Sequence, residues 1–412
     1  MKRTNSKIAS SSLGYAISFL LLIGLVCSGV LFITSVNKRI QVGHELDQHM
    51  LFNNYFGLRY GASTNQVGEQ NIVHTSGDTS LIIVKNWGAF KVVVSSTFHG
   101  SRNVEKSALF GQQTPYKLPV LYVPEHNQEI QLCGDTRIEG TVYRSKRGFE
   151  RGYIGGQHFT GEELVDGKEY QSEKTLPALT IALDQFDLAQ FSSSATRLES
   201  LMNDSSFSFT EPTSLLSSTD GLQVSNHFEG NLVLHSFDSI FVRASAQLVN
   251  VILIAPVIRF EAGFQGKVQA IAEIRITCEE NVYLDYPSAL ILREVENLNP
   301  QIQSTIYLDQ GTRVLGGILL TSEHPNFRSP VHLELNEALV AGLVYNQGET
   351  ELQGKIIGSL YTNQFSLNAG GGQYTNALLN ATLSNKLLPK DFVMPDWIDH
   401  EGISTPTLLS CF

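Results

Sequence analysis

The chain has 412 residues, of which 42% are hydrophobic and 17% charged, and its formal net charge is −11. This apolar fraction is typical of a folded protein, and the acidic balance argues against a nucleic-acid-binding surface, which needs clustered Lys and Arg. The length allows two or three domains, or one elongated repeat architecture.

A long apolar segment near the N-terminus predicts a membrane anchor. Residues 13–36 contain no charged residue, and about 20 residues suffice for a helix that crosses a bilayer. The segment is too long for the apolar region of a cleaved signal peptide, and Lys38 and Arg39 follow it directly. We therefore expect residues 13–36 to contact membrane lipid as a single-pass helix in the inner (cytoplasmic) membrane. The body is then expected in the periplasm or outside the cell.

The helix is expected to continue beyond the membrane, because residues 40–58 carry apolar side chains close to helical spacing. An apolar N-terminal helix that runs into such a stretch resembles the stalk of type IV pilins and pseudopilins. Gly14-Tyr15 is the nearest match to a prepilin cleavage site, and Phe19 stands where those proteins usually carry Glu. The resemblance implies a minor subunit of a pilus or secretion apparatus. An ordinary signal anchor gives the same pattern.

The four cysteines are spaced neither as a disulfide framework nor as a zinc site. Cys27 lies in the apolar segment, and Cys133, Cys278 and Cys411 include no CxxC pair. We expect the cysteines of the body to be buried free thiols.

From about residue 80 the sequence predicts mainly strands. Apolar residues alternate with a period of two in segments such as 81–84, 90–94 and 118–123. Patterns that favour a helix are limited to residues 185–203 and 375–386.

Short strands recur in residues 224–290. The pattern of residues 251–255 returns 17 residues later at 268–272, and a further short strand follows each, at 258–260 and 274–276. Strands at this spacing indicate stacked coils, each of which buries its apolar face on the next.

A glycine between two apolar residues is a second repeated signature. It occurs at Gly140, Gly230, Gly266, Gly316 and Gly354, and a Thr precedes it at Thr136, Thr312 and Thr350. Residues 317–321, 342–346 and 358–362 also match one another. Glycine at a fixed place in a strand pattern marks a sharp corner. We therefore predict a mainly β fold, a right-handed parallel β-helix (solenoid) with an N-terminal transmembrane helix, and an irregular β-sandwich as the alternative.

These patterns divide the chain into four parts. They are the anchor helix and its amphipathic extension (1–60), a β-rich region with inserts and one helical segment (61–223), parallel β-helix repeats (224–389) and a C-terminal tail or cap (390–412).

Two resemblances bear on the body. Residues 136–143, 342–352 and 350–361 resemble the short coils of bactofilins and related polymer-forming β-helical proteins. Residues 118–177, together with the N-terminal helix, resemble uncharacterised membrane-anchored proteins of the Bacteroidetes group. Both resemblances imply an envelope or scaffold role and no known chemistry.

Two polar clusters are the nearest approach to a metal or acid–base site. One contains His158, Glu162 and Glu163, and the other contains Asp396, Asp399, His400 and Glu401 around Trp397. Neither has the helical two-histidine spacing of a zinc site. We expect a glycine-rich surface loop for the first cluster and, for the second, a polar tail in which Trp397 caps the end of the coils.

Parallel β-helices include polysaccharide lyases and hydrolases with charged residues along a groove, and Asp285, Glu294 and Glu296 are the candidates for such a site. Single carboxylates on strands are more often solvated residues of an outer face. No nucleophile elbow, P-loop or Rossmann glycine pattern occurs. The sequence therefore predicts no enzyme and no catalytic, cofactor-binding or metal site. Three or more carboxylates facing one groove would favour the enzyme.

The predicted function is that of a membrane-anchored envelope protein with a structural, assembly or binding role. Its expected partners are membrane lipid and other proteins or further copies of itself, with glycans as a further candidate ligand and nucleic acid excluded. A glycan-active β-helix enzyme and a minor pilin-like subunit are the alternatives.

Overall fold

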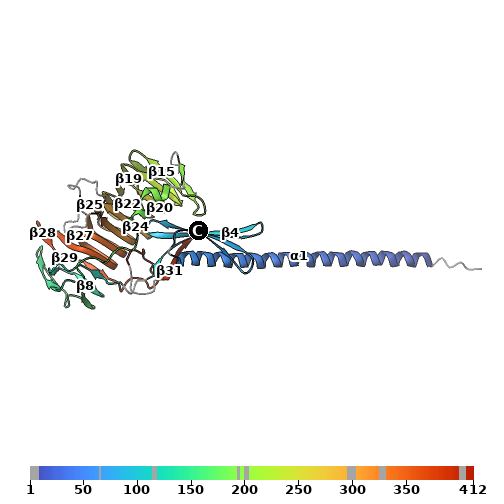
Figure 1. Cartoon of the computed structure of the whole chain (residues 1–412), viewed down its shortest axis with the longest axis horizontal. Coiled ribbons are helices and arrows are strands. Elements are labelled where there is room, and N and C mark those ends of the chain that lie inside the picture. Colours follow the sequence, from blue (N-terminus) through green and yellow to red (C-terminus); the bar gives the residue numbers. More distant parts are fainter. Residues whose placement is uncertain are drawn as a thin grey trace, which may run out of the picture.

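The computed structural model describes residues 9–64, 66–113, 118–192, 195–198, 204–294, 303–323, 331–398 and 405–412. Figure 1 shows a long N-terminal helix that projects from a body built mainly of strands. The large sheets of the body are parallel. The mainly β fold and the long apolar N-terminal helix are therefore confirmed.

Helix α1 (Ala9–Ser63) runs for 55 residues without a proline, which gives a length of about 80 Å. It is the one helix in the described chain that is long and apolar enough to cross a membrane, and its most apolar window has a mean hydropathy of 2.7 and no buried residue. The predicted continuation through residues 40–58 is confirmed, because the helix ends only at Ser63.

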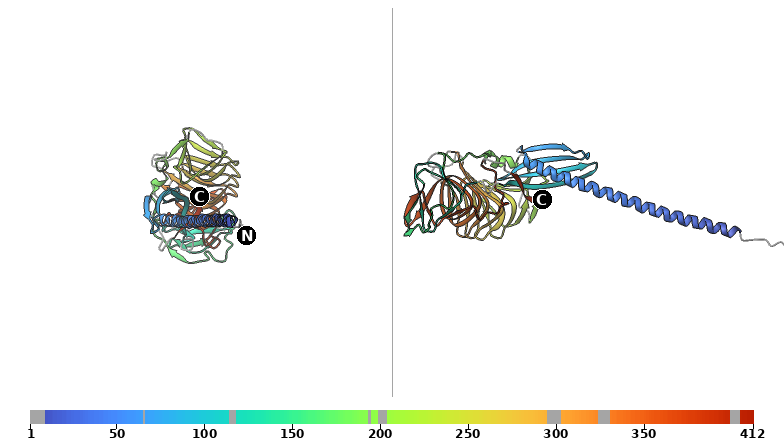
Figure 2. Two further views of the ribbon diagram at one scale, coloured as in Figure 1. Left: turned by 90° about the vertical axis from the view of Figure 1, so that its right-hand side faces the viewer. Right: turned by 90° about the horizontal axis from the view of Figure 1, so that it is seen from below.

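An antiparallel sheet holds the last turns of α1 (Figure 2). Its strands lie in the order β1 (Gly68–Val73), β2 (Thr79–Trp87), β3 (Phe90–His99), β4 (Arg102–Gln113) and β31 (Thr405–Cys411). Leu58 and Ala62 of the helix pack against Ile82, Val93 and other apolar side chains of one sheet face.

Two glycines bring the helix close to this sheet. A Cβ atom at Gly57 would lie 2.4 Å from the Ser95 Oγ atom, and one at Gly61 would lie 2.6 Å from a methyl group of Val93. The buried side chain of Asn54 donates hydrogen bonds to the carbonyl oxygens of Ser95 and Val104, at 2.5 and 3.0 Å. The end of α1 is therefore fixed by close packing and by hydrogen bonds.

The body consists of three stacks of parallel strands. The first stack contains β13 (Thr196–Leu198), β15 (Ser214–Ser218), β18 (Leu232–Ser236), β20 (Gln247–Ile254), β22 (Gln265–Ala272), β24 (Tyr283–Glu294), β26 (Arg313–Ser322), β27 (Val331–Ala369), β5 (Leu121–Tyr122), β8 (Val142–Arg144) and β12 (Glu169–Gln171). Its outer face lies under the antiparallel sheet, where Trp87, Phe90 and Trp397 join a shared apolar layer.

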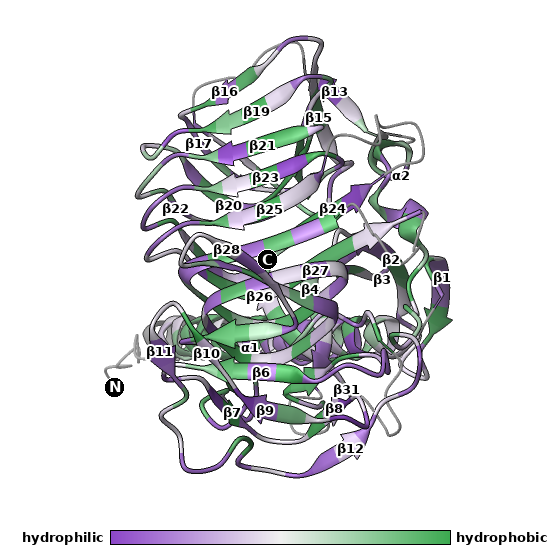
Figure 3. Ribbon diagram, turned by 90° about the vertical axis from the view of Figure 1, so that its left-hand side faces the viewer, coloured by the Kyte–Doolittle hydropathy of each residue, from purple (hydrophilic) through white to green (hydrophobic). Residues whose placement is uncertain are grey.

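The second stack contains β16 (Leu222–Val224), β19 (Ser239–Val242), β21 (Val257–Phe260), β23 (Arg275–Cys278), β25 (Ser304–Leu308) and the first residues of β27. A three-stranded parallel sheet consists of β29 (Ala377–Leu379), β6 (Ile130–Cys133) and β9 (Phe149–Arg151). Figure 3 shows the second stack as a ladder of strands.

The third stack contains β14 (Ser205–Phe207), β17 (His227–Gly230), the first parts of β20, β22, β24 and β26, further residues of β27, then β30 (Thr382–Ser384) and β7 (Arg137–Glu139). The remaining elements are β10 (Tyr153–Ile154), β11 (Gln157–His158), β28 (Gly372–Thr375), the 3-10 helix η1 (Leu183–Phe186) and α2 (Leu188–Ser192). Apolar side chains from all three stacks form one continuous interior.

The register follows the repeat seen in the sequence, with two shifts. Val251 pairs with Val268 as the recurrence of 251–255 at 268–272 predicts, but Ile258 pairs with Ile276 rather than with residue 274. Gly316 pairs with Gly342. The predicted match of residues 317–321 with 342–346 is therefore wrong by one position.

The predicted helix at residues 375–386 is wrong, and the one at residues 185–203 is confirmed only in part. Within 185–203 the structure places only the end of η1, the five residues of α2 and then strand β13, and residues 193–194 and 199–203 lie outside the described chain. Residues 375–386 form β29 and β30, which pair with β6 and β7. Asn376 and Asn380 have φ angles of +51° and +55°, which no right-handed helix contains. Pairing with neighbouring coils thus overrides the local pattern.

A ladder of tyrosines joins coils from distant parts of the sequence. Tyr345, Tyr361, Tyr122, Tyr143 and Tyr170 stack in this order, with ring centroids 6.2, 5.7, 5.5 and 5.3 Å apart. Such pairs contribute about 0.5–1.5 kcal/mol each beyond area burial. The strands β5 and β8 therefore continue the first stack beyond β27.

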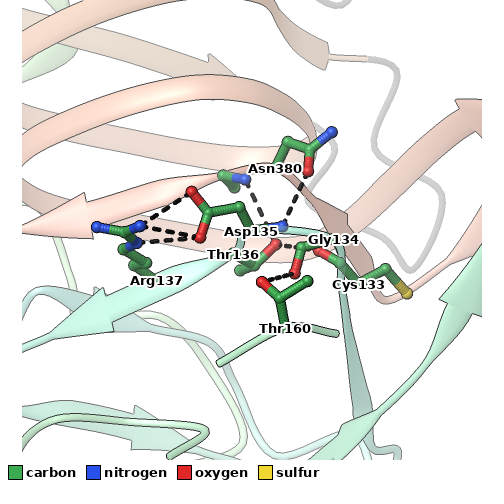
Figure 4. Close-up of polar contacts among 8 residues, drawn as sticks. Cys133, Gly134, Asp135, Thr136, Arg137, Thr160 and Asn380 are labelled. Atoms are coloured by element: carbon green, nitrogen blue, oxygen red, sulfur yellow. Dashed lines mark hydrogen bonds and ion pairs between the residues drawn. The ribbon is translucent and has the colours of Figure 1, made fainter. Parts of the chain in front are cut away.

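Polar side chains fix the corners between strands. Figure 4 shows the corner at Gly134, where the Asp135 amide donates to the Asn380 side chain at 2.9 Å and the buried Thr136 hydroxyl donates to the Cys133 carbonyl at 2.6 Å. Thr312 and Thr350, the other members of the repeated Thr signature, are also fully buried. Thr136 therefore caps a turn of the backbone, whereas Thr312 donates to the Glu279 carbonyl at 2.9 Å and Thr350 shares a hydrogen bond with Thr362 at 2.7 Å.

A column of close backbone contacts sets the spacing of neighbouring parallel strands at three glycines. Gly316, Gly342 and Gly358 have φ angles of +144°, +136° and +144°. A Cβ atom on Gly342 would lie 1.8 Å from the Gly316 oxygen, and one on Gly358 would lie 2.0 Å from the Gly342 oxygen. No other residue fits this column.

Gly342→Ala is expected to destabilise the protein by about 3 kcal/mol or more, because the methyl group overlaps a neighbouring carbonyl and the φ angle suits only glycine. Gly263→Ala is the control, since Gly263 also has a positive φ but nothing lies within 4 Å of its Cβ position; it should lose only about 1 kcal/mol. Thermal unfolding of the full chain in detergent measures both. Equal losses would contradict the role of the column.

Candidate functional site

The residues that the sequence singled out do not come together in one site. His158 lies exposed on β11, with its ring against that of Tyr153 at a centroid distance of 4.2 Å. Glu162 uses its backbone oxygen to accept a hydrogen bond from Arg151. The described residues include no group of three His, Cys, Asp or Glu that could hold a metal ion.

The second predicted cluster is only partly described. Asp396 accepts a hydrogen bond from the Gln112 side chain at 3.2 Å, and Asp399, His400 and Glu401 lie outside the described residues. Trp397 is fully buried, and its ring lies where a side chain at Gly317 would project. Trp397 therefore covers the outer face of the first stack, whereas the sequence placed it at the end of the coils.

The predicted groove carboxylates also remain apart. Asp285 lies near the start of β24 and accepts a hydrogen bond from the Tyr286 amide. Glu294 ends the same strand, is buried, and accepts a hydrogen bond from the Ser322 hydroxyl. Glu296 lies outside the described residues. Opposite ends of one twelve-residue strand cannot form a shared site.

The structure brings other carboxylates together on the outer side of the second stack. We call this region the open face and define it by Arg275, Tyr307, Asp309, His332, Glu334, Glu349 and Glu351, of which His332 and Glu351 are buried. Thr305 pairs with His332 and Tyr307 with Glu334 on adjacent strands, so their side chains lie one coil apart. An open groove of about 570 Å³ lies over Arg275, Tyr307 and Asp309.

Two carboxylates of the open face have opposite acidity. Burial alone would raise the pKa of Asp309, but hydrogen bonds from the Gln310 amide and from the Asn336 and Tyr307 side chains, at 2.8, 3.0 and 3.0 Å, lower it. Burial raises the pKa of Glu334, and the charges of Glu351 and Asp309 raise it further. The face therefore holds a stable carboxylate beside a group that keeps its proton longer, the combination that acid–base chemistry needs.

His332 adds an unused hydrogen-bonding atom to this face. Only 8% of the residue is exposed, and its Nδ1 atom has no hydrogen-bond partner. Burial lowers the pKa of His332, against the opposing charges of Glu349 and Glu351. At neutral pH the ring is therefore uncharged, and its Nδ1 atom is buried without a partner.

Charge pairing divides the second stack into two regions. Arg243 pairs with Glu261 at 3.2 Å, and Arg259 pairs with Glu279. In the described part of the chain, no ion pair includes Asp309, Glu334, Glu349 or Glu351. Unpaired like charges on neighbouring strands are unfavourable, and titratable groups in such surroundings are candidates for a functional site.

The sequence carries a faint signal of the open face. Tyr307 and Asp309, His332 and Glu334, and Glu349 and Glu351 are each two residues apart, so each pair points to one side of a strand. The pairs align only when the register between coils is known.

No protein-family model matches the sequence, and no curated protein matches it. Among solved structures, one match is the crystal structure of the competence-associated pilin ComZ from Thermus thermophilus. The two chains are 12% identical, the match covers 84% of this chain and 86% of that chain, and the TM-score is 0.24.

Glu334→Gln is expected to stabilise the protein at neutral pH and to have little effect at about pH 4. Burial and neighbouring charges raise the pKa of Glu334 in the folded protein above 4.5. The folded state is therefore favoured while Glu334 is protonated, and this stabilisation is lost as the pH rises through the raised pKa. Thermal unfolding of both proteins across this range measures the difference. Glu280→Gln, which changes an exposed carboxylate on the same side of the body, should show no such pH dependence; a similar curve for both variants would contradict the argument.

Proposed function

We propose that this chain is a membrane-anchored, pilin-like envelope subunit whose body, a right-handed parallel β-helix, serves assembly or binding. The observation that carries the proposal is the division of α1. One continuous helix has exposed apolar side chains over residues 13–36 and packs against a sheet at residues 54–62. Such a helix joins a lipid-soluble part rigidly to a folded body.

The dimensions of α1 support its insertion in a bilayer. Residues 13–36 extend over about 36 Å, and the hydrocarbon core is about 30 Å thick. Large apolar side chains such as Leu20, Leu21 and Phe32 are 67–70% exposed. The body leaves this apolar surface uncovered, and insertion of the helix in lipid would remove it from water.

The body supports the β-helix assignment. Strands of three stacks follow one another along the chain and pair in parallel with the strand one coil later. Their interior side chains form one apolar cluster, as stacked coils require. Crossover connections between parallel strands are right-handed in almost all sheets, which favours the right-handed form and fits the bactofilin-like coils expected from the sequence.

The pilin-like part of the proposal rests on the helix and its sheet. Arranged side by side, such helices bury their apolar surfaces against one another, and the attached bodies are then displayed around them. Partners are therefore further copies of this chain or proteins with a similar helix, in the inner membrane or in an assembly built from it.

Cys27 provides a direct test of this assembly. It is exposed within the apolar part of α1, Cys411 is the other exposed cysteine, and Cys133 and Cys278 are buried. Mild oxidation of membranes that contain Cys411→Ser should give a disulfide-linked dimer, because helices that pack side by side bring their Cys27 thiols together. Gel mobility without reductant measures the dimer.

Cys27→Ser is the matched control and should give no dimer through the helix. A chain that remains in the membrane pellet but never crosslinks through Cys27 would show a lone anchor and contradict the pilin-like arrangement. A chain that alkaline carbonate removes from the membrane would contradict the anchor itself.

A glycan-active enzyme is the second candidate, favoured by the carboxylates of the open face. In hydrolysis, water adds across the glycosidic bond: Glu334 would give its proton to the leaving oxygen, and Asp309 would take a proton from the attacking water. The opposite pKa shifts of the two groups suit these roles.

Release of reducing ends from a panel of neutral and acidic polysaccharides tests this candidate. Glu334→Gln and Asp309→Asn should each lower the rate by about 100-fold or more, as loss of general acid–base catalysis does, while Glu280→Gln should not. Absence of cleavage across the panel, or cleavage that survives both changes, would exclude an acid–base role for the open face.

A further inference from the structure

A basic groove lies where α1 leaves its apolar segment. It is lined by Ser35, Lys38, Arg39, Val42, Gly43 and Leu46 of the helix, together with Arg102, and has a volume of about 540 Å³. Arg102 is the first residue of β4, beside the turn between β3 and β4 and far along the sequence from the helix. The sheet reaches back along α1 and brings this turn beside the helix (Figure 2).

Specific contacts hold Arg102 in the groove. Its guanidinium group donates to the Asp47 carboxylate at 2.7 Å and to the Gly43 carbonyl at 3.4 Å. Both groups of this ion pair are half exposed, so the pair itself adds little stability. Its effect is to place a third cation in the groove that Lys38 and Arg39 line.

The end of the groove nearest the apolar segment, at Lys38 and Arg39, lies in the headgroup layer of a bilayer. Lys38 and Arg39 lie about 3–5 Å beyond Val36 along the helix axis. Gly43 lies about 10 Å beyond Val36. The layer on each side of the hydrocarbon core is roughly 5–8 Å thick. Val42 and Leu46 line the part of the groove that lies farther from the membrane.

We propose that this groove binds the phosphate headgroup of an anionic phospholipid in the membrane that α1 crosses. The inference rests on the proposed insertion of α1. Lys38 and Arg39 contact the phosphate from the helix, and Arg102 contacts it from the sheet, so that the bound lipid ties the body to the membrane surface. Each cation near an anionic membrane surface strengthens such binding about fivefold.

The test uses the full chain in nanodiscs of phosphatidylcholine that contain a minor fraction of phosphatidylglycerol. A fluorophore is attached at Ser101→Cys, in a chain that also carries Cys27→Ser and Cys411→Ser. Energy transfer to the same acyl-chain dye on either lipid then reports which lipid surrounds the groove. Phosphatidylglycerol should be enriched over phosphatidylcholine.

Arg102→Gln should weaken the enrichment about fivefold, and the double change Lys38→Gln with Arg39→Gln should weaken it about 25-fold. The double change lies on the exposed part of the helix, so it leaves the folded body intact. Arg137→Gln, an exposed arginine in an ion pair elsewhere in the body, is the control and should have no effect.

Equal transfer to both lipids, or enrichment that survives the double change, would overturn the proposal. Loss of enrichment on addition of inorganic phosphate would also overturn it, because the groove would then take a free anion. Failure of the proposed function is a separate result: the chain would be lost from the nanodisc with any lipid composition.

Discussion

The body depends on how closely the backbone of one parallel strand lies on that of the next. At the corner marked by Gly316, Gly342 and Gly358, each glycine occupies the place where a side chain would meet the carbonyl oxygen of the coil above. This contact permits the usual strand spacing of about 4.8 Å at a sharp bend. It also fixes the register, because a slip of one residue would place a Cβ atom against a carbonyl group.

Because the register is fixed, side chains at equivalent positions of successive strands line up in rows. Leu253, Ala270, Leu290 and Ile318 align along the interior, and on the covered outer face Leu319 leads into the tyrosine ladder at Tyr345. The same alignment places the carboxylates of the open face on neighbouring coils. The interior and the candidate site therefore have one geometric origin.

Local sequence patterns predicted what depends on neighbours along the chain. An uninterrupted apolar run predicted the anchor, and alternation of apolar and polar residues predicted the strands. A short repeat without an insert predicted the pairing of Val251 with Val268. The open face escaped prediction because segments of different length separate Asp309, Glu334 and Glu351, so no fixed spacing marks them. The predicted helix at residues 375–386 was wrong because these residues form strands that pair with β6 and β7, far away in the sequence. Enzymatic activity, partners and the domain boundaries stay predictions.

The pairing of β31 with β4 has a consequence for how the protein is made. The strand that completes the antiparallel sheet is Thr405–Cys411, whereas its neighbour ends at Gln113. At the usual speed of translation the intervening chain takes roughly 15–60 s to emerge from the ribosome. During that interval β4 presents an unsatisfied edge while the helix before it is already available for insertion, so a chaperone that shields exposed strand edges has a defined moment and place to act.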